Sequence, residues 1–97
     1  MAGDEKMRVV AVVPAHNEGA LIGATVDSLL KQVDEVIVAC DNCTDNTKAV
    51  ALNRGATAFD TVNNTARKAG ALNQALSQYV DFSIPNLMVF ICDADTQ

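Results

Sequence analysis

Polar side chains that could bind a metal or a phosphate occur at three places in this 97-residue sequence, each directly after an apolar run. The groups are Pro14-Ala15-His16-Asn17-Glu18, Asp41-Asn42 and Asp93-Ala94-Asp95. Carboxylate oxygens suit Mg²⁺ or Mn²⁺. The sequence has no glycine-rich phosphate loop, so a phosphate-bearing ligand at these carboxylates would require a divalent cation to offset its charge.

The apolar runs that precede these groups predict buried strands. Residues 8–13, 35–40 and 87–92 are short and continuously apolar, and a weaker strand is expected at about 56–60. Residues 14–19 are expected to form a polar loop. Parallel strands place their carboxyl ends at one edge of a sheet, where α/β proteins bind ligands.

Three amphipathic helices are predicted between the strands. The first has its apolar face at Ile22, Val26, Leu29, Leu30 and Val33 and ends near Asp34. The second is expected to be capped by Thr44 or Asp45 and to stop at Gly55. The third runs from about 66 to 80, with Leu72, Ala75, Leu76 and Tyr79 inward.

This alternation predicts an α/β fold, with a Rossmann-like parallel sheet of about four strands between helices on both faces. A chain of 97 residues with 49% hydrophobic content is expected to form one domain, residues 1–97. The net charge of −5 and the scattered basic residues argue against a nucleic-acid partner. No apolar run approaches the roughly 20 residues that span a bilayer, and the acidic N-terminus is unlike a signal peptide. We therefore expect a cytoplasmic chain without a transmembrane segment.

Cys40 and Cys43 have the spacing of a metal or redox pair. A zinc site needs four ligands, and only Cys92 and His16 remain to complete one. We therefore favour a buried Cys40 at a strand end over a metal or redox role.

Four segments in order resemble the motifs of family 2 glycosyltransferases. They are residues 12–18 (VVPAHNE), 41–47 (DNCTDNT), 68–73 (KAGALN) and 93–95 (DAD). Together they extend over nearly the whole chain, and each lies at a loop that the strand pattern predicts. The resemblance implies the first half of a GT-A fold and a nucleotide-diphosphate sugar as donor.

The resemblance also implies roles for individual residues. Pro14, Ala15, His16, Asn17 and Glu18 would line the pocket for base and ribose, beside Asp41 and Asn42. Asp41 would accept a hydrogen bond from the base imide, which favours a UDP-sugar. Asp93 would meet the ribose, and Asp95, with Asp93, would hold Mn²⁺ or Mg²⁺ at the donor's two phosphates. The same resemblance places Lys68 near the diphosphate or the sugar.

Structural roles remain open for several of these residues. Asn17 or Glu18 could instead cap the first helix, and Lys68 could simply be solvated. His16 replaces the aromatic residue often found at its position in the family, and Cys43 replaces the usual serine.

The acceptor site and the carboxylate base of the family lie after the Asp-x-Asp motif, where this sequence stops at Gln97. We therefore expect the chain to bind donor and metal but to transfer sugar poorly or not at all. The last strand should be an exposed apolar edge, through which the chain could associate with a second copy or a complementing chain.

Two alternative functions compete with this one. A non-catalytic nucleotide-binding or assembly module derived from such an enzyme is the first. A sugar-nucleotide pyrophosphorylase would need a basic, glycine-rich loop after the first strand, which residues 14–18 do not provide.

Overall fold

The computed structural model describes residues 7–62 and 67–92, the side chains of 67–69 excepted. Strands and helices alternate along these residues, in the predicted order. They are β1 (Arg8–Ala15), α1 (Gly19–Leu30), β2 (Glu35–Cys40), α2 (Thr47–Asn53), β3 (Thr57–Asp60), α3 (Arg67–Gln78) and β4 (Leu87–Ile91). The elements predicted from the apolar patterns are thus confirmed in type and order.

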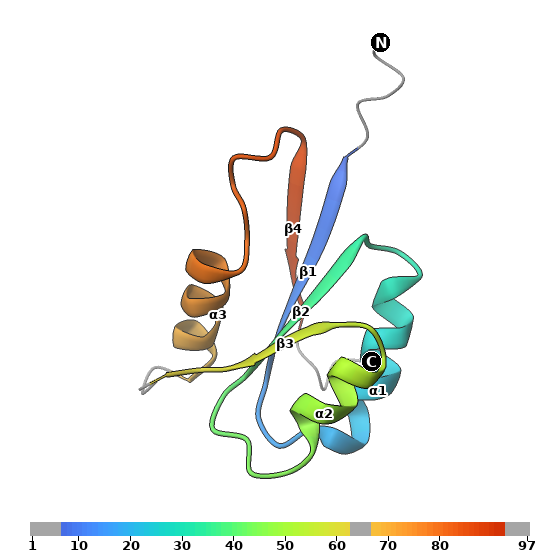
Figure 1. The fold of residues 1–97 in the computed structure, drawn as a ribbon, viewed down its shortest axis with the longest axis vertical. Helices are drawn as coiled ribbons and strands as arrows, with labels where there is room; N and C mark the ends of the chain where they lie inside the picture. The colour runs from blue at the N-terminus through green and yellow to red at the C-terminus, as the bar shows by residue number, and fades with distance from the viewer. Residues whose placement is uncertain (1–6, 63–66, 93–97) are drawn as a thin grey trace.

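The four strands form one parallel sheet in the order β3-β2-β1-β4. Helices α1 and α2 lie on one face of this sheet and α3 lies on the other (Figure 1). The predicted three-layer α/β architecture is therefore confirmed. Because the chain moves outward from β1 to β3 and then returns to pair β4 with the other side of β1, the strand order reverses next to β1. Such a reversal marks the usual ligand-binding edge of a parallel sheet.

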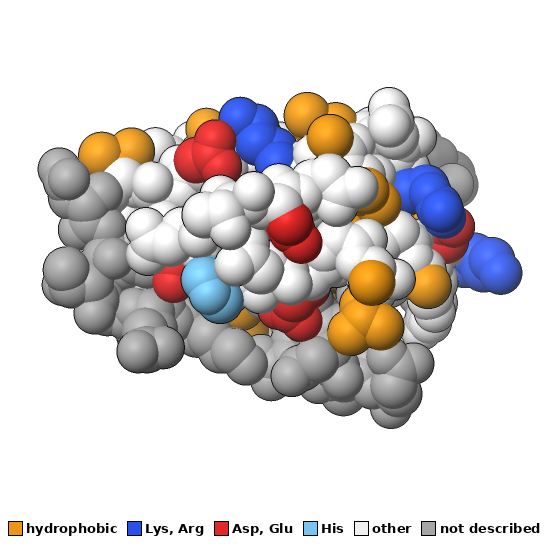
Figure 2. Space-filling view, turned by 90° about the horizontal axis from the view of Figure 1, so that it is seen from below, with side chains coloured by type: hydrophobic (Ala, Val, Ile, Leu, Met, Phe, Trp, Pro, Cys, Tyr) orange, Lys and Arg blue, Asp and Glu red, His pale blue; other side chains and the backbone are white. Residues whose placement is uncertain are grey.

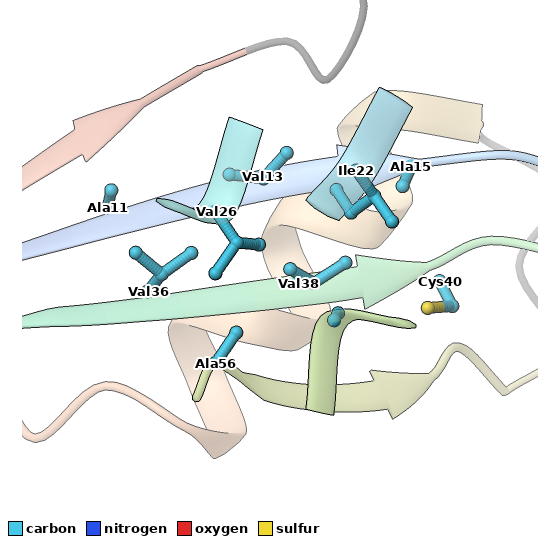
Figure 3. Packing of buried hydrophobic residues seen from close by; sticks show 10 residues of the cluster. Ala11, Val13, Ala15, Ile22, Val26, Val36, Val38, Cys40 and Ala56 are labelled. Atoms are coloured by element: carbon cyan, nitrogen blue, oxygen red, sulfur yellow. The ribbon is translucent and has the colours of Figure 1, made fainter. Parts of the chain in front are cut away.

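The apolar runs are continuous because both faces of the sheet are covered. Along β1, Ala11 and Val13 pack toward α1, while Val10 and Val12 pack toward α3. Figure 3 shows Ile22 and Val26 of α1 among the side chains that β1 and β2 direct toward this helix. Parallel strands buried on both faces lack the polar alternation of a half-exposed strand, as observed here.

Pro14 and Ala15 belong to β1, which corrects the prediction of a polar loop over residues 14–19. They pair with Ala39 and Cys40 of β2, and both side chains are buried. Proline fits this central strand because of its register: Cys92 donates its N–H to the carbonyl of Val12, so the next position on that side of β1 is Pro14. This position lies past Ile91, the last residue of β4, so the missing N–H of Pro14 costs no β1–β4 ladder bond within the strand.

Helix α2 ends where predicted, at a glycine with a left-handed backbone. Gly55 has φ +97°, its N–H bonds to the Leu52 carbonyl, and the N–H of Ala56 bonds to the Ala51 carbonyl. This pair of bonds is the Schellman arrangement, which favours glycine because a side chain is strained at this φ.

One edge of the sheet is only partly covered. Met88, Phe90 and Ile91 of β4 are exposed, whereas Leu87 and Val89 pack toward α3. Within the described residues β4 pairs with β1 alone, so the predicted exposed apolar edge is confirmed. No helix among these residues is long and apolar enough to cross a membrane.

Candidate functional site

The carboxyl ends of β1, β2 and β3 converge at one end of the molecule. Figure 2 looks onto this end and shows the imidazole among acidic side chains, with lysine and arginine side chains toward the periphery. Two asparagines in its loops, Asn17 and Asn42, adopt positive φ values of 50° and 54°. Asparagine is among the few residues that tolerate positive φ, so the backbone conformation alone favours asparagine at both positions.

Asp41 is the most enclosed polar residue of this end. It follows β2 directly, its N–H bonds to the Ala15 carbonyl at 2.7 Å, and the residue is 9% exposed. Its Oδ1 accepts hydrogen bonds from Asn42 Nδ2 at 3.1 Å and from Thr61 Oγ1 at 3.1 Å. A buried carboxylate is stabilised by such donors, and their positions hold its orientation.

His16 lies against the backbone of Asp41. Its Nδ1 is 2.7 Å from the Asp41 carbonyl oxygen. A carbonyl can only accept, so Nδ1 carries the proton, and in the neutral ring Nε2 is left as an acceptor. The residue as a whole is exposed. His16 therefore joins the β1–α1 loop to the residue that follows β2, with one nitrogen remaining to meet a ligand.

Asn17 ties the same two loops together. Its Oδ1 accepts the backbone N–H groups of Thr44, at 2.7 Å, and of Asp45, at 3.2 Å, while its own N–H points to Cys43 Sγ at 3.3 Å. The alternative of Asn17 as a cap of α1 is therefore wrong: its side-chain oxygen serves the loop before α2.

Glu18 occupies the N-cap position of α1 without a side-chain cap bond. Its Oε1 accepts the N–H of His16 at 3.1 Å, and its backbone carbonyl accepts from Leu21 and Ile22. The carboxylate that binds the first residue of α1 comes from Asp45, whose Oδ2 accepts the N–H of Gly19 at 3.0 Å.

Asp45 serves both helices at once. Its Oδ1 accepts the N–H and the hydroxyl of Thr47, the first residue of α2. The prediction that Thr44 or Asp45 caps this helix is nevertheless wrong, because Asn46 holds the N-cap position. The hydrogen bonds from Thr47, followed by that from Gly19, lower the pKa of the Asp45 carboxyl. The residue whose N–H binds Asp45 Oδ2 is a glycine, Gly19, because a Cβ at this position would lie 2.1 Å from Asn46 Oδ1.

The two cysteines of the β2–α2 segment have structural contacts. Cys40 is fully buried at the end of β2, as predicted, and Cys43 hydrogen-bonds to it and to the Ala15 carbonyl at 3.5 Å. Burial, then the neighbouring Cys43 and Asp60, raises the pKa of the Cys40 thiol to about 12. A thiol in this state is a poor nucleophile and a poor metal ligand at neutral pH.

The remaining predicted site residues are only partly placed. Lys68 lies in the first turn of α3, and the position of its side chain is outside the described part of the chain, as are Asp93 and Asp95. Cys92, the last described residue, donates its backbone N–H to the Val12 carbonyl of β1 at 3.0 Å. Within residues 7–62 and 67–92, no three His, Cys, Asp or Glu side chains are grouped to hold a metal ion.

Thr61 is a residue of this site that the sequence reasoning missed. It is the first residue after β3, as Asp41 is the first after β2, and its N–H bonds to the Cys40 carbonyl at 3.0 Å. The signal was available, because a residue directly after a parallel strand belongs to the ligand edge. It was overlooked because the β3 pattern is short and a threonine is not distinctive.

This fold and ligand edge define a class of protein. The sequence pattern described as "Glycosyl transferase family 2" matches residues 10–97, which is most of the chain, and the protein belongs to this family. The resemblance stated from the four motifs is thereby confirmed.

Curated relatives share this portion of their sequence. The chain is 39% identical over 87 residues to 4,4'-diaponeurosporenoate glycosyltransferase of Staphylococcus aureus (strain USA300). The match covers 87% of this chain and 23% of the relative, so the chain spans about a quarter of the length of such relatives.

Solved structures share the fold. Glucosyl-3-phosphoglycerate synthase from Mycobacterium tuberculosis, in complex with Mn²⁺, UDP-glucose and phosphoglyceric acid, superposes with a TM-score of 0.77 at 28% identity, over 97% of this chain and 35% of that one. Mannosyl-3-phosphoglycerate synthase from Rubrobacter xylanophilus gives 0.72 at 25% identity, over 93% and 31% of the respective chains. These neighbours are GT-A glycosyltransferases, and the chain has the corresponding portion of that fold.

Proposed function

We propose that this chain binds a nucleotide-diphosphate sugar, with a UDP-sugar favoured, as the donor-binding part of a glycosyltransferase that transfers a hexose to an acceptor hydroxyl. The observation that carries the proposal is Asp41, an oriented and nearly buried carboxylate at the ligand edge of a family 2 chain. Two solved neighbours contain UDP or UDP-glucose together with Mn²⁺, which supports the donor class.

Base recognition is assigned to the residues around Asp41. A carboxylate oxygen accepts hydrogen bonds only, and the imide of uracil offers a single N–H donor. Pro14 and Ala15 have buried side chains, so any contact they make with the nucleotide would use their backbone. His16, Asn17, Glu18 and Asn42 would complete the pocket wall, and exposed His16 offers Nε2 to a hydroxyl group.

The divalent cation is assigned to Asp95 and Asp93, with Asp93 also near the ribose. The donor set fits Mg²⁺ or Mn²⁺, because these ions are commonly held by one or two carboxylates together with substrate phosphates. When bound, the cation would neutralise charge on the diphosphate leaving group. Lys68 is proposed to approach the diphosphate or the sugar.

Calorimetric titration of the purified chain with UDP and with GDP, each with and without Mn²⁺, tests this proposal. We expect metal-dependent binding of UDP and weaker binding of GDP. Asp95→Ala should abolish the metal dependence, and Asp41→Ala should weaken UDP binding at least about tenfold, because both remove charged ligand contacts.

Asp81→Ala is the matched control, because Asp81 is an exposed carboxylate in the segment between α3 and β4, which leads into the amino end of β4. It should bind UDP as the unaltered chain does. Equal UDP affinity in the Asp41, Asp95 and Asp81 variants would contradict the proposed site. GDP binding as tight as that of UDP would contradict the assignment of the base.

A non-catalytic nucleotide-binding or assembly module remains the second candidate. Nucleotide binding without turnover would fit this module as well as the donor-binding part of an enzyme. We propose that this chain binds the donor but does not itself transfer the sugar. Sugar transfer to a defined acceptor by the purified chain, lost in Asp95→Ala, would contradict it.

A further inference from the structure

Thr61 is held firmly beside Asp41 by two neighbouring elements. Its backbone N–H bonds to the Cys40 carbonyl at 3.0 Å, which extends the β2–β3 ladder by one residue beyond Asp60. The next residue, Val62, bonds through both its N–H and its carbonyl to the side-chain amide of Gln74 in α3, at 2.8 and 2.9 Å. The backbone on both sides of the Thr61 side chain is therefore fixed by the sheet and by α3.

The hydroxyl of Thr61 donates to Oδ1 of Asp41 at 3.1 Å. This is a hydrogen bond from a neutral donor to a carboxylate that is 9% exposed, and such charge-assisted bonds are stronger than neutral ones. Asn42, which also donates to Oδ1, follows Asp41 directly and has a left-handed backbone. Thr61 directly follows a separate strand, β3, so its hydrogen bond relates the carboxylate to the rigid sheet.

We propose that Thr61 is a positioning residue for base recognition, which sets the orientation of the Asp41 carboxylate toward the imide of a bound uracil nucleotide. The inference rests on the proposed function, because it assigns Thr61 a role in the nucleotide affinity that Asp41 supplies. Thr61 itself is not proposed to contact the base. Its hydroxyl is expected to act only through Asp41, and removing it should cost affinity for ligands that present an imide N–H.

Three variants separate this role from a merely structural one. Thr61→Val replaces the hydroxyl by a methyl group of similar size. Thr61→Ala removes the hydroxyl and the methyl group of threonine, and Thr61→Ser retains the hydroxyl. Each is titrated in the presence of Mn²⁺ with UDP and with its N3-methyl analogue, in which the imide N–H is absent. Thermal melts of each variant establish that it is folded at the temperature of the titration.

We expect Thr61→Val and Thr61→Ala to weaken UDP binding about fivefold, the effect of one hydrogen bond. Both should bind the N3-methyl analogue within about twofold of the unaltered chain, and Thr61→Ser should restore UDP binding. In an Asp41→Ala background, Thr61→Val should have no further effect on UDP affinity, because the group through which it acts is gone.

Equal weakening of UDP and of its N3-methyl analogue would overturn the positioning role, because a general loosening of the site affects both ligands alike. Unchanged UDP affinity in Thr61→Val and Thr61→Ala would overturn it as well. A different result identifies failure of the proposed function itself: the unaltered chain and Asp41→Ala would then bind UDP equally, or neither would bind it.

Discussion

Strands β2 and β4 both pair with β1 and have similar apolar sequences, EVIVAC and LMVFI, but their surroundings differ. In β2, residues 36–40 are fully buried, between α1 and α2 on one face and α3 on the other. In β4, Met88, Phe90 and Ile91 are 40% to 50% exposed. The comparison shows that an apolar run predicts a strand, whereas its burial depends on which elements pack on both of its faces and edges.

The largest expected effect tests this difference with one substitution at two places. Ile37 in β2 is fully buried, and Ile91 in β4 is 50% exposed. Ile37→Ala should lower the free energy of unfolding by about 3 kcal/mol, because it loses buried area and leaves a cavity. Ile91→Ala should cost about 1 kcal/mol or less. Urea unfolding of the two variants gives both values, and equal losses would contradict the contrast between the strands.

The buried thiol of β2 predicts a second effect, on the pH dependence of stability. Burial first, then Cys43 and Asp60, raises the pKa of Cys40 from 9.0 to about 12. Because the folded pKa is raised, the protonated Cys40 thiol contributes fully to the free energy of unfolding below pH 9. This contribution is lost as the pH rises toward 12. The slope should approach about 1.4 kcal/mol per pH unit in this window.

The measurement is urea unfolding at several pH values between 8 and 11, compared with Cys40→Ala, which lacks the titrating group. The variant should lose less stability than the unaltered chain over this range. Cys92→Ala is the matched control, since Cys92 is only partly buried. Parallel pH profiles for the unaltered chain and Cys40→Ala would contradict the assignment.

Much of this architecture follows from local pattern. The runs at residues 35–40 and 87–92 identify strands because they are short and continuously apolar, and the spacing from Ile22 to Val33 identifies the buried face of α1. Gly55 marks the end of α2 because few other residues adopt its φ. These features depend on residues close together in the chain, which is why the sequence alone predicts them.

The candidate site is harder to predict because its contacts join residues far apart in sequence. Asn17 binds the backbone of Thr44 and Asp45, and Thr61 binds Asp41. No spacing rule relates these positions, since each contact depends on the sheet register. Pro14 was expected in a loop because proline usually breaks a central strand. It lies in β1 instead, and only the sheet register, which the sequence does not reveal, makes it acceptable there.

A third prediction compares two exposed carboxylates whose pKa values are both lowered. Hydrogen bonds from Thr47 lower the pKa of Asp45, and those from Ser83 lower that of Asp81. Asp45 also binds Gly19 and so joins α1 to α2, whereas the described partner of the Asp81 side chain, Ser83, is two residues away. Asp45→Ala should therefore lower the melting temperature more than Asp81→Ala.

Acid should reduce the contribution of both carboxylates, Asp45 and Asp81, to the stability of the fold. A lowered pKa means that each contribution is present above the ordinary carboxyl pKa and is lost as the pH falls through the lower folded value. The difference in melting temperature between the unaltered chain and Asp45→Ala should therefore shrink on acidification. A difference that stays constant down to the lowest pH at which the chain folds would show that the charge of Asp45 is not what matters.

The smallest expected effect concerns the exposed edge of β4. A strand with unpaired backbone groups and apolar side chains can pair with another chain, so we predict weak self-association, with Kd on the order of 100 μM. Phe90→Lys should shift the chain toward monomer in sedimentation velocity across a concentration series. Leu52→Lys is the matched control, because Leu52 on α2 is 49% exposed and Phe90 is 47% exposed. A monomer mass at every concentration, or equal effects of both substitutions, would show that β4 is not the contact.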